Sequence, residues 1–165
     1  MAGQPGAGFV TGAPTLPGLS FAFRIEAEIA PPRSAGPGLS GQRLHIPITG
    51  GIVSGPRLSG RILPGGSDWA LIRPDGMTRI EAHYTIEAED GTLIYVVNTG
   101  LRISTPEALA KVRQGEALPP EAFYMRGAPV FDAPHGPHGW MNDRLFVCAI
   151  RPRSMGVDIG VYVLE

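Results

Sequence analysis

The chain has 165 residues, 18% of them charged, and a formal net charge of −1 at pH 7. This length fits one domain, and a charge so near zero provides no field that would hold a nucleic acid or an anionic membrane. Glycine and proline number 23 and 17, together nearly a quarter of the chain. Their usual combined share is about 12%. In a chain that is 43% hydrophobic, so many turn-forming residues favour short strands over helices.

The first third of the chain predicts two long strands. Phe21–Ala30 and Gln42–Val53 each alternate apolar and polar residues, which is the pattern of a strand with one buried face. A loop is expected between them, over Pro31–Gly41. Gly50 and Gly51 in the second strand mark a sharp bend, or a place where another backbone or a ligand comes close.

The middle of the chain predicts short strands and then a hairpin. Turn clusters at residues 64–66 and 74–76 bound short strands over Arg57–Leu63 and Asp68–Ile72. Two long strands follow, joined by the hairpin signal Asp90-Gly91. Their ranges are Met77–Glu89 and Thr92–Arg102. One face of the first strand carries Ile80, Ala82, Tyr84, Ile86 and Ala88, and the other face carries Arg79, Glu81, His83, Thr85 and Glu87.

The last third predicts one helix and three strands. The helix begins after a cap at Ser104 or Thr105 and ends at Gly115. The strands cover Ala122–Phe131, Arg144–Ile150 and Val157–Leu164.

These elements predict an all-β fold of about eight to ten strands with one short helix. No alternation of strands and helices appears, so an antiparallel barrel, closed or nearly closed, is favoured, since closure removes exposed strand edges. A sandwich of two sheets is the second choice. We expect one domain over residues 19–165, preceded by a flexible arm rich in Gly and Pro over residues 1–18.

Several motifs in order resemble a known family. They are PITGG (47–51), GPRLSGRILPGGSDW (55–69), RPDG (73–76), IYVVNTGLR (94–102), FYMRGAPVFDAP (123–134) and WMNDRLFVC (140–148). Over residues 20–163 they resemble domain-of-unknown-function family 3237, also called the UPF0311 family. The resemblance implies a small barrel of lipocalin-like or calycin-like appearance, often assembled into homo-oligomers. It also implies that a few relatives tailor natural products without a metal or nucleotide. Where the family pattern has an aspartate and an arginine, this chain has Glu81 and His83.

Four residues are candidates for acid–base chemistry: Asp68, Glu81, His83 and Tyr124. Asp68 precedes Trp69, and a carboxylate beside a large apolar ring can be desolvated, which raises its pKa towards neutrality. Alternatively, Asp68 accepts hydrogen bonds from turn amides while Trp69 fills the core. Glu81 and His83 share one face of a strand. Facing inward they would form a proton-transfer pair, and facing outward, which the alternation slightly favours, they would be a solvated surface.

Further residues are candidates for ligand binding. Asn98 and Arg102 share a strand face, where Arg102 can bind a carboxylate or phenolate and Asn98 can polarise a carbonyl. Arg102 can instead form a salt bridge at the barrel rim. A concave site with aromatic walls is typical of small-molecule pockets. Its predicted members, converging on one barrel mouth, are Asp68, Trp69, Asn98, Arg102, Tyr124, Arg126, Trp140 and Asn142.

No motif predicts a metal or a cofactor. His135 and His138 lie in a Gly/Pro loop without an obvious third ligand. The glycine runs do not match a nucleotide-binding loop. No GxSxG motif occurs, and Ser67 has no evident base. Cys148, the only cysteine, lies in the apolar run LFVCAI, which indicates an inert, buried thiol.

Three hypotheses about function stay open. The first is a cofactor-free acid–base enzyme of the lyase, isomerase or cyclase type, acting on a small aromatic or carbonyl-bearing organic acid. The second is a barrel that binds such a ligand without turnover. The third is a structural homo-oligomer, a dimer or tetramer, with a filled interior. The start of the chain lacks the pattern of a secretory signal and no apolar run has membrane-spanning length, so a cytoplasmic protein is expected, with no nucleic-acid or membrane partner.

Overall fold

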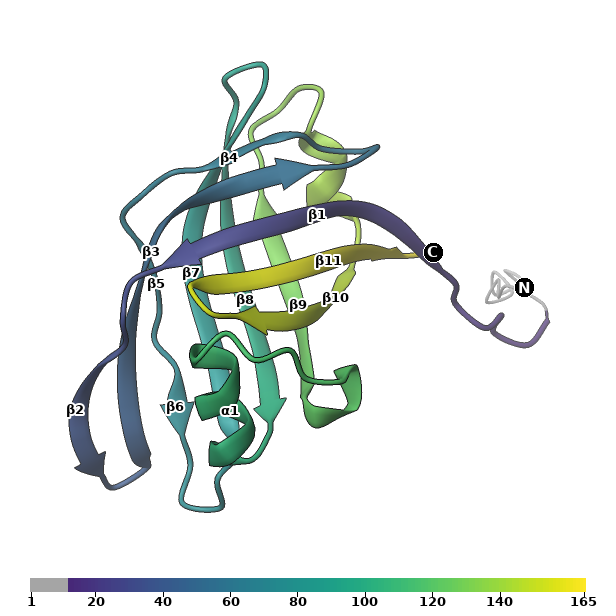
Figure 1. The fold of residues 1–165 in the computed structure, drawn as a ribbon. Coiled ribbons are helices and arrows are strands. Elements are labelled where there is room, and N and C mark those ends of the chain that lie inside the picture. The colour runs from purple at the N-terminus through teal and green to yellow at the C-terminus, as the bar shows by residue number, and fades with distance from the viewer. Residues whose placement is uncertain (1–11) are drawn as a thin grey trace, which may run out of the picture.

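Eleven strands within residues 12–165, the part of the chain that the structure describes, form one antiparallel sheet that closes on itself. The coordinates are a computed structural model. The strands are β1 (Leu19–Ile29), β2 (Arg33–Gly38), β3 (Gly41–Ser54), β4 (Gly60–Ile62), β5 (Gly66–Asp68), β6 (Leu71–Ile72), β7 (Thr78–Ala88), β8 (Leu93–Ile103), β9 (Tyr124–Asp132), β10 (Phe146–Arg153) and β11 (Gly156–Leu164). Figure 1 shows them wound around a common axis.

The barrel has eight positions around its wall. Neighbouring strands follow the order β1-β11-β10-β9-β8-β7, and the short strands β4, β5 and β6 share the next position, between β7 and β3. Pairing of β1 with β3 closes the circle, with Ile25 opposite Val53. The predicted closed barrel is therefore confirmed, and the alternative of two stacked sheets is excluded.

The interior follows the alternation of the sequence. On β7 every inward side chain is buried, and the outward ones are half-buried or exposed. The inward set is Ile80, Ala82, Tyr84, Ile86 and Ala88, as the period of two predicts. One end of the barrel is filled by aromatic rings: Phe131 lies edge-on to Phe23 at 5.7 Å and to Phe146 at 4.8 Å between ring centroids.

Three predicted elements differ from the structure, the first only in extent, since the strand expected over Arg57–Leu63 is limited to β4, Gly60–Ile62. The segment Pro31–Gly41, expected as a loop, contains β2, which pairs with β3 through Ser34 opposite Leu44. β2 lacks alternation because neither of its faces is covered, so no hydrophobic pattern marks it. The short strand expected over Asp68–Ile72 is divided into the end of β5 and β6, and the two residues between them keep single backbone hydrogen bonds to β7 and β3.

Three helical segments connect the strands: α1 (Pro106–Arg113), and the 3-10 turns η1 (Pro120–Ala122) and η2 (Gly139–Asp143). Thr105 caps α1, since its Oγ1 accepts a hydrogen bond from the Ala108 amide at 3.2 Å. Gly115, with φ +84°, ends it as predicted. Figure 1 shows α1 across one end of the barrel. Within residues 12–165, no helix has the length and apolar character that crossing a membrane requires.

The predicted N-terminal arm is described only in part. Residues 1–11 lie outside the described residues. Residues 12–18 form neither helix nor strand and are exposed, and in Figure 1 they extend away from the barrel.

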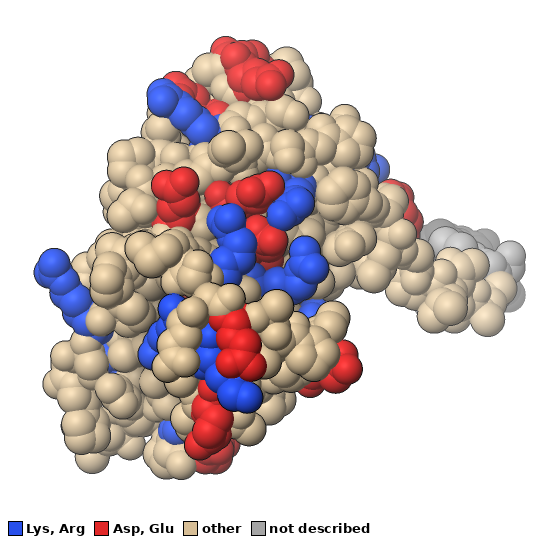
Figure 2. Space-filling model, viewed as in Figure 1, with Lys and Arg blue, Asp and Glu red and all other residues tan. Residues whose placement is uncertain are grey.

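An ion-pair network crosses the outer face of β1, β10 and β11. Its centre is Asp158, which lies 2.9 Å from Arg24 Nη2, 3.1 Å from Arg153 Nε and 3.7 Å from Arg151 Nη2. Figure 2 shows these charges gathered at the middle of one face. Fixed contacts of this kind suit the planar guanidinium group, and here they link three neighbouring strands.

Gly51 marks the closest approach of two backbones in the closing pair. Its φ is +149°, and a Cβ atom there would lie 2.4 Å from the carbonyl oxygen of Glu26 on β1. Of the two sequence-based interpretations of Gly50-Gly51, the approach of another backbone is therefore the one that the structure bears out.

We expect Gly51→Ala to lower the free energy of unfolding by about 2–3 kcal/mol, because the methyl group forces β1 and β3 apart. Denaturant titration measures the change. Gly38→Ala is the control, since the nearest atom to its added Cβ would be 3.5 Å away, and its stability should match the wild type. Equal stability of the two variants would show that the closing pair tolerates separation.

Candidate functional site

A cavity of about 300 Å³ occupies the half of the barrel next to α1. Its mouth lies among α1, the Pro31-Pro32 segment after β1, and the Ser154-Met155 turn between β10 and β11. The walls are mainly aliphatic. Four polar side chains on neighbouring strands interrupt them: Asp68, Tyr84, Asn98 and Arg102.

Strand register brings these four side chains together. Asp68 on β5 lies opposite Ala82 on β7, which lies opposite Asn98 on β8. The small Ala82 side chain leaves space between the carboxyl and the amide. Arg102 lies four residues further along β8, on the same inward face, and Tyr84 lies two residues further along β7 in the opposite direction, towards the aromatic end.

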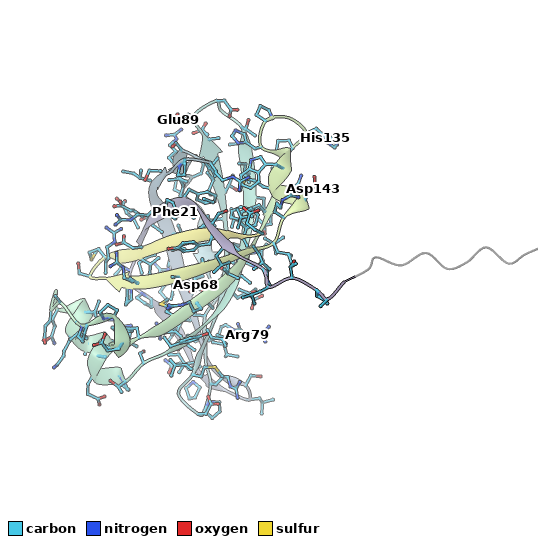
Figure 3. All side chains as sticks on the ribbon, turned by 90° about the vertical axis from the view of Figure 1, so that its right-hand side faces the viewer. Phe21, Asp68, Arg79, Glu89, His135 and Asp143 are labelled. Carbon is cyan, nitrogen blue, oxygen red and sulfur yellow. The ribbon has the colours of Figure 1, made fainter. Side chains whose placement is uncertain are left out.

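Burial dominates the electrostatics of Asp68. Loss of solvent raises the pKa of its carboxyl above the ordinary value, and a hydrogen bond from the Glu81 amide at 3.0 Å and the charge of Arg102 offset part of this rise. Figure 3 shows Asp68 at mid-height of the barrel, between Arg79 and Glu89. A carboxyl group with a raised pKa in an apolar cavity is a candidate acid or base towards a bound ligand.

Arg102 is the cation of the cavity wall. Its Nη2 donates a hydrogen bond to Thr78 Oγ1 at 2.9 Å. Burial and the nearby charge of Arg113 lower the pKa of Arg102 from its ordinary value, and Asp68 acts in the opposite direction. A guanidinium group remains protonated despite such a shift, so the cavity holds a fixed positive charge near its mouth.

Tyr84 and Asn98 are buried donors with unused capacity. The Tyr84 hydroxyl has no hydrogen-bond partner among the described residues, and burial raises its pKa well above the ordinary range. Asn98 is 2% exposed, and its recorded side-chain partner is the sulfur of Cys148 at 3.6 Å. Burial raises the pKa of that thiol to about 11, consistent with the expected inert cysteine.

Glu81 and His83 face outward, the orientation that the alternation slightly favours. Glu81 lies 3.7 Å from Arg43, and His83 Nδ1 shares a hydrogen bond of 2.7 Å with the Tyr95 hydroxyl. They do not line the cavity. The acid–base pair considered for the interior is therefore not assembled there.

Trp69 also lies outside the cavity. It follows Asp68 directly in extended backbone, so the two side chains point to opposite faces. Its ring stacks on His45 with 4.4 Å between ring centroids and an interplanar angle of 11°. The desolvation of Asp68 consequently comes from the aliphatic wall of the barrel. Ser67 has a neighbouring base that the sequence does not reveal, since His45 Nε2 lies 2.7 Å from its Oγ.

Four further predicted site residues lie away from the cavity. Tyr124 and Arg126 are exposed on the outer face of β9. Trp140 lies beneath the guanidinium group of Arg57, 4.0 Å from its ring centroid. Asn142 fastens η2 to β9 by accepting from the Ala133 amide at 2.9 Å and donating to its carbonyl at 2.8 Å. The expected convergence of eight side chains on one mouth thus reduces to Asp68, Asn98 and Arg102.

The histidine loop makes a contact of a different kind. His138 Nε2 lies 3.0 Å from Asp90 Oδ2 and so joins the loop to the β7–β8 hairpin. Among the described residues, no group of three or more His, Cys, Asp and Glu side chains is placed to hold a metal ion.

Tyr84 is the site residue that sequence reasoning missed. Its place in the alternation assigns it to the face of its strand that carries Ile80, Ala82, Ile86 and Ala88. The available signal was chemical: a tyrosine among aliphatic residues on a buried face brings a hydroxyl that requires a partner.

Fold and cavity together define a class: small closed antiparallel β-barrels with a ligand-sized interior. The sequence matches the family described as a protein of unknown function, DUF3237, over residues 17–164. A UPF0311 protein of Rhodopseudomonas palustris is 40% identical over 149 residues, covering 90% of this chain and 97% of that protein. One of Clostridium acetobutylicum is 41% identical over 125 residues, covering 76% and 79%. The chain belongs to the DUF3237 family, and its relatives from R. palustris and C. acetobutylicum carry the name UPF0311.

Solved structures agree with the fold. The crystal structure of the R. palustris protein, described as a conserved protein of unknown function, has a TM-score of 0.84 at 37% identity and covers 93% of this chain and 100% of its own. A hydroalkoxylation enzyme of Penicillium herquei is 31% identical over 86 residues, covering 52% of this chain and 57% of that enzyme. The crystal structure of an enzyme from P. herquei has the same fold, with a TM-score of 0.69 at 22% identity, and covers 94% and 100%.

We expect Asp68→Asn to raise the melting temperature at neutral pH. The folded pKa of Asp68 lies above its ordinary value of 3.8, so its contribution to stability is complete below that pH and is lost as pH rises through the folded pKa. Asparagine removes the buried charge and can still accept from the Glu81 amide. A gain of about 1 kcal/mol, or about 2–4 °C, is expected at pH 7.5, and the gain should shrink as pH falls towards 4.

Calorimetry across this pH range measures the difference, with Asp143→Asn as an exposed control. A variant less stable than the wild type at every pH would mean that the Asp68 charge stabilises the barrel through Arg102.

Proposed function

We propose that this chain is a cofactor-free acid–base enzyme of the lyase, isomerase or cyclase type, acting on a small organic molecule in the barrel cavity. The observation that carries the proposal is a carboxyl group with a raised pKa, Asp68, on the wall of an apolar cavity that also holds a cation, Arg102. The relative named as a hydroalkoxylation enzyme supports an enzymatic function over a structural one. The cavity also counts against a filled interior.

The reaction class that suits these groups is the addition of a hydroxyl group across a carbon–carbon double bond of the same molecule. Protonated Asp68 gives its proton to one alkene carbon. The ligand hydroxyl oxygen then bonds to the other carbon, and the hydroxyl proton returns to the Asp68 carboxylate. Atoms and charge balance without any further reactant. Arg102 favours the carboxylate that exists between the two transfers, and the aliphatic walls keep water from capturing the cation.

A suitable probe is 2-(3-methylbut-2-enyl)phenol, which carries a phenol and an electron-rich alkene and cyclises to a chroman. We expect the wild type to form the chroman and Asp68→Asn to lose at least about 100-fold in rate, the scale of general acid catalysis. Since the protonated carboxyl is the acid, the rate should be constant below the raised pKa of Asp68 and fall above it. Chromatography of the product across a pH series measures both effects.

Asp143→Asn serves as the control and should react like the wild type. A probe that binds but is recovered unchanged from both proteins would favour a carrier without turnover. Equal rates for wild type and Asp68→Asn would remove Asp68 from the chemistry.

We also propose that copies of the chain associate through the outer face of β8 and β9. Six exposed apolar side chains lie on this face, together with the charged Arg126 and Asp132 of β9; the apolar ones are Leu93, Tyr95, Leu101, Ile103, Tyr124 and Val130. Polar residues of β7 border it on one side, namely Arg79, Glu81, His83 and Glu87. An apolar patch with a polar rim is typical of a contact surface, and a two-fold axis through it would pair each patch with its copy.

We expect Val130→Lys to convert an associated species to monomer in light-scattering measurements, because it places a charge at the centre of the face. Leu39→Lys changes an exposed leucine in the β2–β3 turn and should leave the assembly intact. An unchanged mass for Val130→Lys would place any association elsewhere.

A further inference from the structure

The polar groups of the cavity are arranged along its length. Arg102 lies at the mouth end, opposite Thr78 and within range of the charge of Arg113 on α1. Asp68 and Asn98 lie at the middle level. Tyr84 lies six residues beyond Thr78 on β7, about 20 Å of extended strand at the backbone. The side chains of Arg102 and Tyr84 extend from these two levels into the same cavity.

The inner end of the cavity offers a hydrogen-bond donor. The side chain of Tyr84 is 4% exposed and lines the cavity, and its hydroxyl has no partner among the described residues. Burial raises the pKa of the hydroxyl, so it stays protonated and donates. Asn98, diagonally opposite on β8, has only a weak sulfur partner. A buried donor left without an acceptor costs free energy in the folded state, so a ligand that supplies the acceptor recovers this cost.

The charged groups lie at the other end or at the middle. Among the residues that line the cavity, the ionisable side chains other than Tyr84 are Asp68, Arg102, Arg113 and Arg153. Three of the four are cations. Arg113 belongs to the helix at the mouth, and Arg153, also at the mouth, is already paired with Asp158. An anionic group is therefore favoured at the mouth, and a neutral one at the inner end.

We propose that the cavity takes an elongated organic ligand with an anionic oxygen group at the mouth end, bound by Arg102, and an uncharged oxygen acceptor at the inner end, bound by the Tyr84 hydroxyl. This inference rests on the proposed function, because it names the substrate class of the same cavity. An aryl ketone that bears a carboxylate at its far end has this pattern. Tyr84 would thus orient the ligand and place its middle portion beside Asp68.

The test uses two unreactive probes of nearly equal shape. In 3-(4-acetylphenyl)propanoate the inner end is a ketone, and in 3-(4-isopropylphenyl)propanoate a methyl group replaces the ketone oxygen. We expect the wild type to bind the ketone about tenfold more tightly in calorimetric titration. Tyr84→Phe should bind both probes equally, through loss of affinity for the ketone alone. Tyr162→Phe makes the same change on the outer wall and should keep the preference.

The mouth contact is tested in the same way. The methyl ester of the ketone probe should bind the wild type about tenfold more weakly than the acid, and Arg102→Gln should remove this difference. The effects of Tyr84→Phe and Arg102→Gln should be additive, because the two contacts lie at opposite ends of the ligand.

Tyr84→Phe is expected to fold, since it removes only a buried hydroxyl without a partner, and its melting temperature should equal or exceed that of the wild type. A ketone preference that persists in Tyr84→Phe, or wild-type protein that binds neither probe, would overturn the inference. If the binding tests fail while Asp68-dependent turnover is observed, the inference about the ligand is wrong and the proposed enzymatic function is retained. A Tyr84-dependent preference without turnover of the phenol probe would indicate a carrier for the same ligand class.

Discussion

Pairing of β1 with β3 is the constraint on which the rest of the structure depends. Without it the strands would form an open sheet with two edges, and the inward face would be in contact with water. The pair forms because Gly51 allows the two backbones to approach more closely than any side chain would permit. Closure produces an interior of low dielectric constant, and that environment raises the pKa of Asp68. It also leaves the Tyr84 hydroxyl without a hydrogen-bond partner among the described residues.

The polar groups of the cavity oppose the stability that closure provides. A desolvated carboxyl and an unpaired hydroxyl each cost free energy in the folded state. The aromatic end of the barrel, where Phe23, Phe131 and Phe146 pack together, and the ion pairs around Asp158 offset such costs. The barrel therefore separates into a packed half that holds the fold and a hollow half that can hold a ligand, which is how sites with perturbed groups are commonly supported.

Most of the fold could be predicted from alternation, because each long strand has one covered face. β2 could not, because neither of its faces is covered. For the site, the alternation of inward and outward residues along β8 was sufficient to place Asn98 and Arg102 on the same inward face. Adjacency in the sequence was misleading for Trp69, which was expected to desolvate Asp68, because the two side chains point away from each other. Contacts between strands, such as that of Ser67 with His45, depend on strand register, which one sequence does not reveal. The same holds for the Tyr84 hydroxyl, which has no hydrogen-bond partner among the described residues.

The alternation of β7 has an evolutionary consequence. Odd-numbered positions from Arg79 to Glu87 lie on the outer face, and even-numbered positions from Ile80 to Ala88 lie on the inner face. A substitution on β7 therefore changes either the interior of the barrel or its outer surface, and seldom both. A lineage can accordingly adopt new ligands by exchanging a few inward residues, such as the small Ala82, while its exterior and its associations drift independently.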